Sequence, residues 1–139
     1  MLDHASQVSF PGGVIESGES SQQAALREFS EETGAPADAI RPLGRLSELY
    51  LFASNYQIVP WVGSTESYPT WNPNPGEVER LLEIPLAHLA DSASTGAIER
   101  RQRGLTFSAP CFQWEAERIW GATSMMLAEL IASLAGLDL

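Results

Sequence analysis

The pattern of apolar and polar positions predicts a chain that alternates between short strands and a few helices. Apolar residues recur at helical spacing over residues 20–33 and again over residues 121–134, and both stretches are long enough for an α-helix. Shorter apolar runs, typical of strands, occupy residues 7–10, 43–52, 56–62, 77–84 and 118–120. We also expect a short helix at residues 86–89 and a hairpin at residues 98–107.

Local signals bound the first helix, and the order of elements indicates the fold class. Ser20 can cap the start of the helix, Gly34 can end it, and Pro36 prevents its continuation. Residues 67–76 are rich in proline and are predicted to form a loop. Strands before and after helices in mixed order predict an α+β fold, or an α/β/α sandwich around a mixed sheet.

Length, charge and cysteine content limit the classes of protein to which this chain can belong. A chain of 139 residues is expected to form a single domain, residues 1–139. Eighteen acidic and eight basic residues give a net charge of −10, which disfavours nucleic acid as a partner, and no apolar run is long enough to cross a membrane. The lone Cys111 has no thiol partner, so we expect a cytoplasmic protein.

Acidic residues crowd into the first predicted helix. Glu28, Glu31 and Glu32 stand at positions i, i+3 and i+4, which places them on one helical face. Like charges so close destabilise a helix unless a cation compensates them, and carboxylate oxygens suit Mg²⁺ or Mn²⁺. Gly12 and Gly13 give the preceding loop conformational freedom. A divalent metal could then stand between these carboxylates and an anionic substrate.

The spacing of these residues resembles the Nudix box. That pattern is Gly, five residues, Glu, seven residues, Arg-Glu, an apolar residue, any residue, Glu-Glu, any residue, Gly and an apolar residue. Its fixed positions are met by Gly13, Glu19, Arg27, Glu28, Phe29, Glu31, Glu32, Gly34 and Ala35. A match of this length is not expected by chance in one chain.

The resemblance implies a Nudix-type α/β/α sandwich that hydrolyses a diphosphate bond in a nucleoside diphosphate derivative. Glu28 and Glu32 would bind Mg²⁺ or Mn²⁺, and Glu31 would be a further ligand or the general base. Arg27 would orient the glutamates. A small nucleotide would be the substrate; the resemblance names no substrate-binding residue. Bound metal would lower the pKa of a water molecule, and a neighbouring carboxylate would accept its proton.

Flanking segments resemble the coenzyme A pyrophosphatase branch, which yields 3',5'-ADP and 4'-phosphopantetheine. They include Phe10-Pro11-Gly12-Gly13, Ser54-Asn55-Tyr56 and Ile119-Trp120-Gly121-Ala122-Thr123. Leu2 and Ser6 replace an arginine and a glycine of that branch, so we expect weak cleavage of coenzyme A. If the start of the chain lies near the site, Leu2→Arg should improve this cleavage. The relatives also carry further strands upstream, so the sandwich is expected to lack its N-terminal strands. We therefore expect either a homodimer or an unusually exposed sheet edge.

Several alternatives stay open. ADP-ribose or another nucleotide could be the substrate, and a non-catalytic nucleotide-binding module would also account for the fold. Glu77 or Glu79 could supply a distal metal ligand. Packing or surface roles are favoured over substrate contacts for His4, His88, Trp61, Tyr68, Trp71, Arg100, Arg101 and Arg103.

Overall fold

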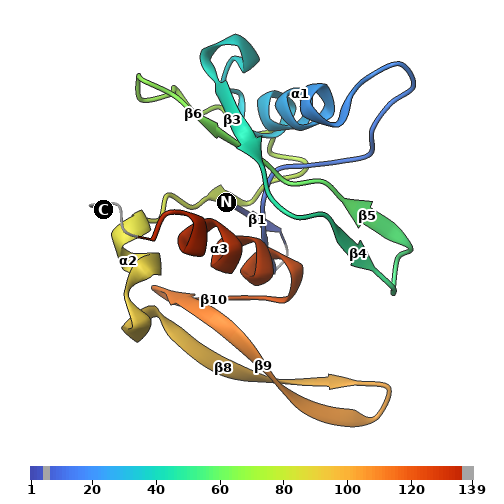
Figure 1. Cartoon of the computed structure of the whole chain (residues 1–139), viewed down its shortest axis with the longest axis vertical. Coiled ribbons are helices and arrows are strands. Elements are labelled where there is room, and N and C mark those ends of the chain that lie inside the picture. Colours follow the sequence, from blue (N-terminus) through green and yellow to red (C-terminus); the bar gives the residue numbers. More distant parts are fainter. Residues whose placement is uncertain (5–6, 136–139) are drawn as a thin grey trace. The chain divides into compact units, whose positions relative to one another are not determined.

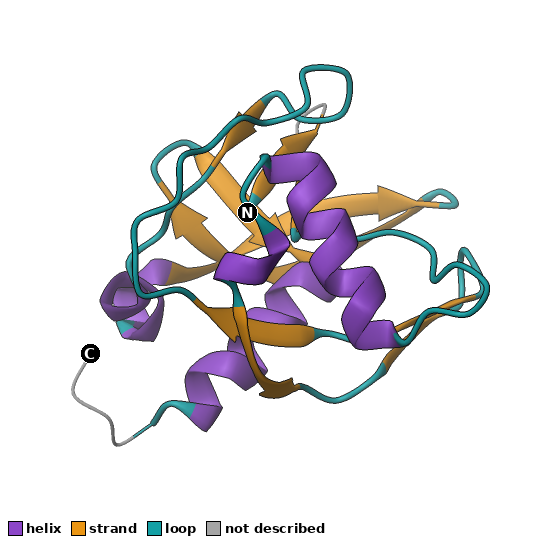
Figure 2. Ribbon diagram, turned by 90° about the horizontal axis from the view of Figure 1, so that it is seen from above, coloured by secondary structure: helices purple, strands orange, loops and turns teal. Residues whose placement is uncertain are grey.

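The computed structural model describes residues 1–4 and 7–135. It divides into two compact units, Met1–Leu82 and Glu83–Leu139, each built from both helices and strands (Figures 1 and 2). The α+β class predicted from the sequence is therefore confirmed. None of the helices in the described ranges is long and apolar enough to cross a membrane.

The first unit is organised around a three-stranded antiparallel sheet and the helix α1 (Ser21–Thr33). In this sheet β1 (Leu2–His4) lies between β2 (Gln7–Ser9) and β7 (Arg80–Leu81). The unit's core contains the buried side chains of Leu2, Val8, Ala24, Ala35, Val78 and Leu82. The strand β1 had no counterpart among the predicted elements.

Two further antiparallel ladders complete this unit. β3 (Arg41–Arg45) pairs with β6 (Trp61–Ser64), and β4 (Leu49–Leu51) pairs with β5 (Tyr56–Ile58). The predicted strands 43–52 and 56–62 are thus each divided in two. The interruption coincides with Pro60, which has no N–H to donate and whose carbonyl instead accepts from Leu46 N at 2.9 Å.

The predicted strand 77–84 shrinks to the two residues of β7. The reason is the turn before it, where the carbonyl of Asn74 accepts hydrogen bonds from Glu77 N at 3.1 Å and from Val78 N at 2.9 Å. Those N–H groups are then no longer available to a strand neighbour. A 3-10 turn, η1 (Ala37–Ala39), follows α1.

The second unit is a long hairpin covered by a helix. β8 (Thr95–Gln102), β9 (Leu105–Trp114) and β10 (Glu117–Trp120) form an antiparallel sheet in the order β10-β9-β8. Arg103 and Gly104 both have positive φ at the tip, as a tight two-residue hairpin turn requires. The helix α3 (Gly121–Ser133) lies against β9 and β10, while α2 (Leu86–Ala90) and η2 (Ser92–Ser94) precede β8.

Strand pairing differs from the mixed sheet expected from the sequence. Every pair within the described ranges is antiparallel. Short connections explain this for β1–β2, β4–β5, β8–β9 and β9–β10, because strands joined by tight turns can pair only in opposite directions. The pairs β1–β7 and β3–β6 join segments that are distant in the sequence, so their direction is set by the tertiary structure. Residues 4 and 7 flank Ala5 and Ser6, which lie outside the described residues.

Candidate active site

Local sequence determines where α1 begins and ends. Gln23 N donates to the Ser20 hydroxyl at 3.1 Å, and Ser20 N donates to the Gln23 side chain at 2.8 Å. This reciprocal pair satisfies two N–H groups that have no partner inside the helix. Gly34 ends the helix in the left-handed conformation, with φ at +78°, and its N–H reaches Ser30 O at 2.9 Å. The predicted boundaries of this helix are confirmed.

Arg27 lies at the centre of a cluster of carboxylates. Its Nε and Nη2 donate to the two oxygens of Glu19 at 3.0 and 2.7 Å. Its Nη1 donates to Glu28 Oε1 at 2.9 Å and to Glu31 Oε2 at 3.3 Å. Glu16 lies 3.7 Å away. We call these five residues the Arg27 cluster.

Arg27 also joins α1 to the loop that precedes it. Besides the bidentate pair with Glu19, its Nη2 donates to Val14 O at 3.1 Å. A guanidinium can make such fork-shaped contacts because its five N–H groups are fixed in one plane. The prediction that Arg27 orients the glutamates therefore agrees with the geometry of its contacts to Glu28 and Glu31.

The cluster changes the titration of two of its members. The hydrogen bonds from Arg27, and then the backbone N–H of Glu16, lower the pKa of Glu19 from 4.5 to about 2. The same carboxylates, Glu19 first and Glu28 second, raise the pKa of Arg27 further above its ordinary value. Glu19 and Arg27 therefore stay charged throughout the neutral range, and one cation faces four acidic side chains.

Two glycines of the preceding loop lie against the glutamates of α1. Gly12 N donates to Glu32 Oε2 at 3.2 Å, and the Glu32 side chain is buried. A Cβ at Gly13 would lie 2.5 Å from the carboxylate carbon of Glu28, so any larger residue would displace that carboxylate. The loop thus lies close against Glu28 and Glu32, and glycine at position 13 leaves the Glu28 carboxylate in its present place.

The residues present fit a hard divalent cation by donor chemistry and by charge. Glu28, Glu31 and Glu32 contribute carboxylate oxygens from one side of α1, and the excess negative charge around Arg27 would attract a cation. In this structure Glu28 and Glu31 accept hydrogen bonds from Arg27, and Glu32 accepts one from Gly12 N. Within the described ranges no three His, Cys, Asp or Glu side chains converge on one point.

Glu77 and Glu79 follow Asn74, whose N–H donates to Glu32 O at the end of α1. Glu77 and Glu79 are exposed residues of the turn before β7. Neither contributes to a convergent group of metal-binding side chains within the described ranges. A distal ligand at either position stays a prediction.

Trp61, Arg100 and His88, for which packing or surface roles were favoured, all contact other residues of their own unit. Trp61 Nε1 donates to Ser21 Oγ at 3.0 Å and so ties β6 to the start of α1. Arg100 lies over the Trp120 ring at 4.1 Å. His88 Nε2 lies 2.6 Å from Gln113 O, and its ring packs edge-on against Trp114.

Leu2 does not lie where a substrate-binding arginine could act. Its side chain is only 1% exposed and belongs to the core of the first unit, where β1 pairs with both neighbouring strands. An arginine at this position would have to bury its charge. The expectation that Leu2→Arg improves cleavage of coenzyme A is therefore wrong: we expect it to disrupt the sheet. Ser6, the other departure from the branch pattern, lies outside the described residues.

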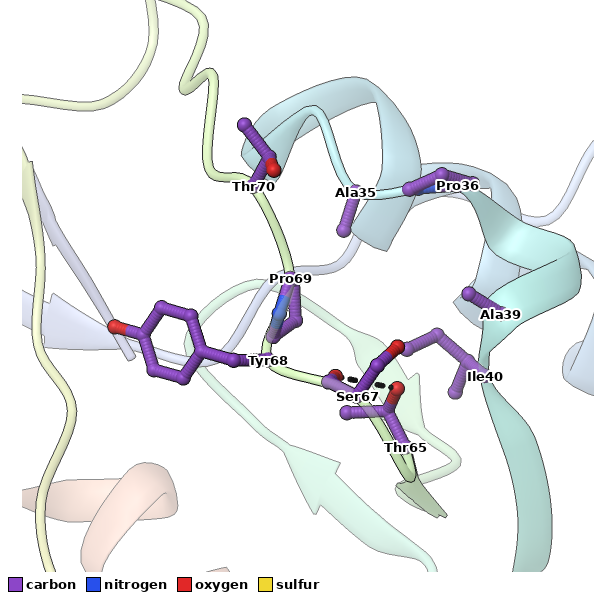
Figure 3. Close-up of a pocket in the computed structure, with 9 residues that line it drawn as sticks. All are labelled: Ala35, Pro36, Ala39, Ile40, Thr65, Ser67, Tyr68, Pro69 and Thr70. Carbon is purple, nitrogen blue, oxygen red and sulfur yellow. Dashed lines mark hydrogen bonds between the residues drawn. The ribbon is translucent and has the colours of Figure 1, made fainter.

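A pocket of about 230 Å³ opens beside the end of α1 (Figure 3). Its walls come from two segments, Ala35, Pro36, Ala39 and Ile40 on one side and Thr65, Ser67, Tyr68, Pro69 and Thr70 on the other. None of these side chains is charged at neutral pH, and Thr65 already donates its hydroxyl hydrogen to Ser67 O at 3.0 Å. The pocket therefore lacks the cations or metal ligands that a diphosphate group requires, and it is not the reaction site.

Comparison with known proteins identifies the family. The model of the NUDIX domain matches residues 2–102, which include the whole of α1 and the loop before it. This chain belongs to the Nudix family. The Nudix-type hydrolase fold predicted from the box is thereby confirmed at the level of the family.

Its similar Nudix relatives are bacterial proteins named "Uncharacterized Nudix hydrolase NudL". The protein of Photorhabdus laumondii is 32% identical over 131 residues, which cover 94% of this chain and 70% of the relative. The protein of Yersinia enterocolitica is 34% identical over 128 residues, covering 91% and 65%, and that of Salmonella newport is 32% identical, covering 91% and 66%. The chain thus spans about two thirds of the length of these relatives, and their name gives no substrate.

Sequence reasoning missed several groups around α1. The N–H groups of Gly12, Asn72 and Asn74 and the carbonyl of Val14 all hold α1 or its carboxylates. They are backbone atoms, so residue type gives no direct signal for them. The alternation of Asn and Pro over residues 72–75 is the one sequence feature that could have pointed to a rigid, extended segment there.

Proposed function

We propose that this chain hydrolyses the diphosphate bond of a nucleoside diphosphate derivative with the help of Mg²⁺ or Mn²⁺. The observation that carries the proposal is the Arg27 cluster, in which one guanidinium holds carboxylates of the preceding loop and of α1 together. Family membership gives the reaction class. The three glutamates on one helical face supply the carboxylates that would bind the metal and accept the proton.

Each residue has a role that its contacts support. Glu28 and Glu32 would hold the metal, because the Glu28 carboxylate lies against Gly13 and the Glu32 carboxylate accepts from Gly12 N, which places both beside the same loop. Glu31 would be a further ligand or the general base. Its side chain is 57% exposed, so water can reach its carboxylate, which would take a proton from that water as the oxygen attacks phosphorus. Arg27 would orient Glu28 and Glu31 without touching the substrate.

Bound metal would neutralise the diphosphate, stabilise the leaving phosphate and lower the pKa of the attacking water. Attack forms a new P–O bond to the water oxygen and breaks the bond to the bridging oxygen, which leaves with the second phosphate. The protein residues supply the proton acceptor and a fixed site, and no covalent intermediate with the chain is needed.

Coenzyme A or an acyl derivative is our first candidate substrate, with 3',5'-ADP and (acyl-)4'-phosphopantetheine as products. The support is the ordered similarity of flanking segments such as Phe10-Pro11-Gly12-Gly13 and Ile119-Trp120-Gly121-Ala122-Thr123 to that branch. Replacement of the branch's arginine by the buried Leu2 weakens this support. ADP-ribose is the second candidate.

We also propose that the protein is cytoplasmic and forms a homodimer. The single, buried Cys111 supports the location. The two-stranded sheets β3-β6 and β4-β5 support the dimer, because their open edges can pair with another chain.

The deciding experiment incubates the full chain with Mg²⁺ or Mn²⁺ and coenzyme A, ADP-ribose, NADH or a dinucleoside polyphosphate. Products are identified by ion-exchange chromatography and mass spectrometry, with a chelator as the blank. Cleavage of one compound at its diphosphate bond into two phosphorylated products, lost with chelator, is the expected result. If the chain binds a nucleotide but cleaves none under any metal condition, the enzyme hypothesis is wrong and the non-catalytic binding module is favoured.

A further inference from the structure

Residues 71–74, which we call the helix brace, lie along the end of α1. Asn72 N donates to Thr33 O at 2.8 Å, and Asn74 N donates to Glu32 O at 3.0 Å. The last carbonyls of a helix have no N–H partner within the helix itself. The brace therefore supplies two of the missing donors, and one of them holds the backbone of the glutamate expected to bind metal.

The sequence of the brace explains why its backbone is available for this. Pro73 and Pro75 have no N–H and favour an extended conformation in the residue before each of them. Asn72 and Asn74 are those residues, and their N–H groups are the donors to α1. The carbonyl of Asn74 is fixed in turn by Val78 N at 2.9 Å. The brace is thus a stiff segment anchored at its far end.

Trp71 adds a side-chain contact one turn earlier on the helix. Its ring meets the Phe29 ring edge-on, with the centroids 6.1 Å apart. Phe29 is adjacent to Glu28 in the sequence, so a contact that limits rotation of α1 at Phe29 also limits movement of the Glu28 backbone. Edge-to-face pairs of aromatic rings have a preferred geometry, which makes this contact directional.

Gly34 allows the close approach of the brace. A Cβ at Gly34 would lie 2.7 Å from the Cβ of Asn72 and 2.9 Å from its carbonyl carbon. Both neighbours are close to the main chain and cannot rotate away. Any residue larger than glycine would therefore push the brace off the end of α1.

We propose that the helix brace is a positioning element for the metal-binding carboxylates of α1. It holds Glu32 through the backbone, while Gly12 N holds the Glu32 carboxylate at 3.2 Å from the other side. It steadies Glu28 through Phe29 and Trp71. The proposal rests on the proposed function, since it assumes that these carboxylates bind a divalent cation. Positioning groups outside the ligand set commonly change metal affinity or activity about 10- to 100-fold.

A matched pair of glycine substitutions tests the proposal. Gly34 and Gly104 share a φ of +78°, but a Cβ at Gly104 meets nothing within 4 Å, so Gly104→Ala carries the same backbone strain without the clash. The dissociation constant of Mn²⁺ is measured by electron paramagnetic resonance, and the melting temperature by circular dichroism. We expect Gly34→Ala to bind Mn²⁺ at least about tenfold more weakly than Gly104→Ala. Equal Mn²⁺ affinity in the two folded variants would overturn the proposal.

Trp71 gives a second test that does not depend on the folding of Gly34→Ala. We expect Trp71→Ala to weaken Mn²⁺ binding and to raise the metal concentration for half-maximal activity, while kcat at saturating metal changes less. Trp71→Phe keeps a ring against Phe29 and should recover most of the loss. Parent affinity in Trp71→Ala would contradict the role of the brace alone. A parent chain that neither binds Mn²⁺ nor cleaves any substrate would contradict the proposed function and the brace together.

Discussion

Replacing Glu28 by glutamine removes one charge from the Arg27 cluster with almost no change in shape. Glu28 Oε1 accepts from Arg27 Nη1 at 2.9 Å, and a glutamine oxygen can accept the same hydrogen bond. The side chain is 16% exposed. The substitution therefore tests the metal-binding charge separately from the packing of the site.

The expected effects on stability and on activity differ widely in size. A partly exposed carboxylate surrounded by other carboxylates contributes little to the fold, so the free energy of unfolding should change by less than about 1 kcal/mol. Loss of a metal ligand should lower kcat/KM about 100- to 10,000-fold, which corresponds to about 2.7 to 5.4 kcal/mol of transition-state stabilisation. A large activity loss with an unchanged fold is the expected signature of Glu28→Gln.

Glu16→Gln is the matched control. Glu16 also faces Arg27, at 3.7 Å, but its side chain is 69% exposed and lies outside the box positions. The assay compares kcat/KM at several Mg²⁺ concentrations with urea denaturation of the same preparations. Full activity in Glu28→Gln, or an equal loss in Glu16→Gln, would refute the assignment of Glu28 as a metal ligand.

The structure supports three further predictions. Leu2→Arg should lower the free energy of unfolding in urea by more than about 3 kcal/mol, because Leu2 is fully buried, whereas the same change at Leu105, 72% exposed, should have almost no effect. The Arg27 contact lowers the pKa of Glu19 to about 2, below its unfolded value, so its contribution to stability is complete above about pH 4.5 and is lost as the pH falls toward 2. Glu19→Gln should therefore flatten the acid side of the parent's stability profile, and an unchanged slope would contradict the contact. Ser20→Ala should cost about 1 kcal/mol by urea denaturation, since it removes the hydroxyl that accepts from Gln23 N, while Ser20→Asp should restore most of the loss.

The sequence by itself determined α1 and the composition of the candidate site. The capping pair of Ser20 and Gln23 and the left-handed Gly34 act within a few residues, so their effect is readable from neighbouring letters. The spacing of Glu28, Glu31 and Glu32 fixes their common face for the same reason, because helical geometry repeats every 3.6 residues. The resemblance to the Nudix box rests on this one helix and its loop.

Tertiary contacts decided the remaining features. In the sequence, Leu2 stands where the coenzyme A pyrophosphatase branch has an arginine. In the structure, Leu2 pairs with residues 9 and 81, and its side chain belongs to the core. The predicted strands 43–52 and 56–62 are divided because hydrogen bonding between distant segments sets where a strand ends. The brace reaches Glu32 across about forty residues of chain, through backbone N–H groups that every residue except proline carries. Such contacts depend on which segments meet in space, which single-residue preferences do not specify.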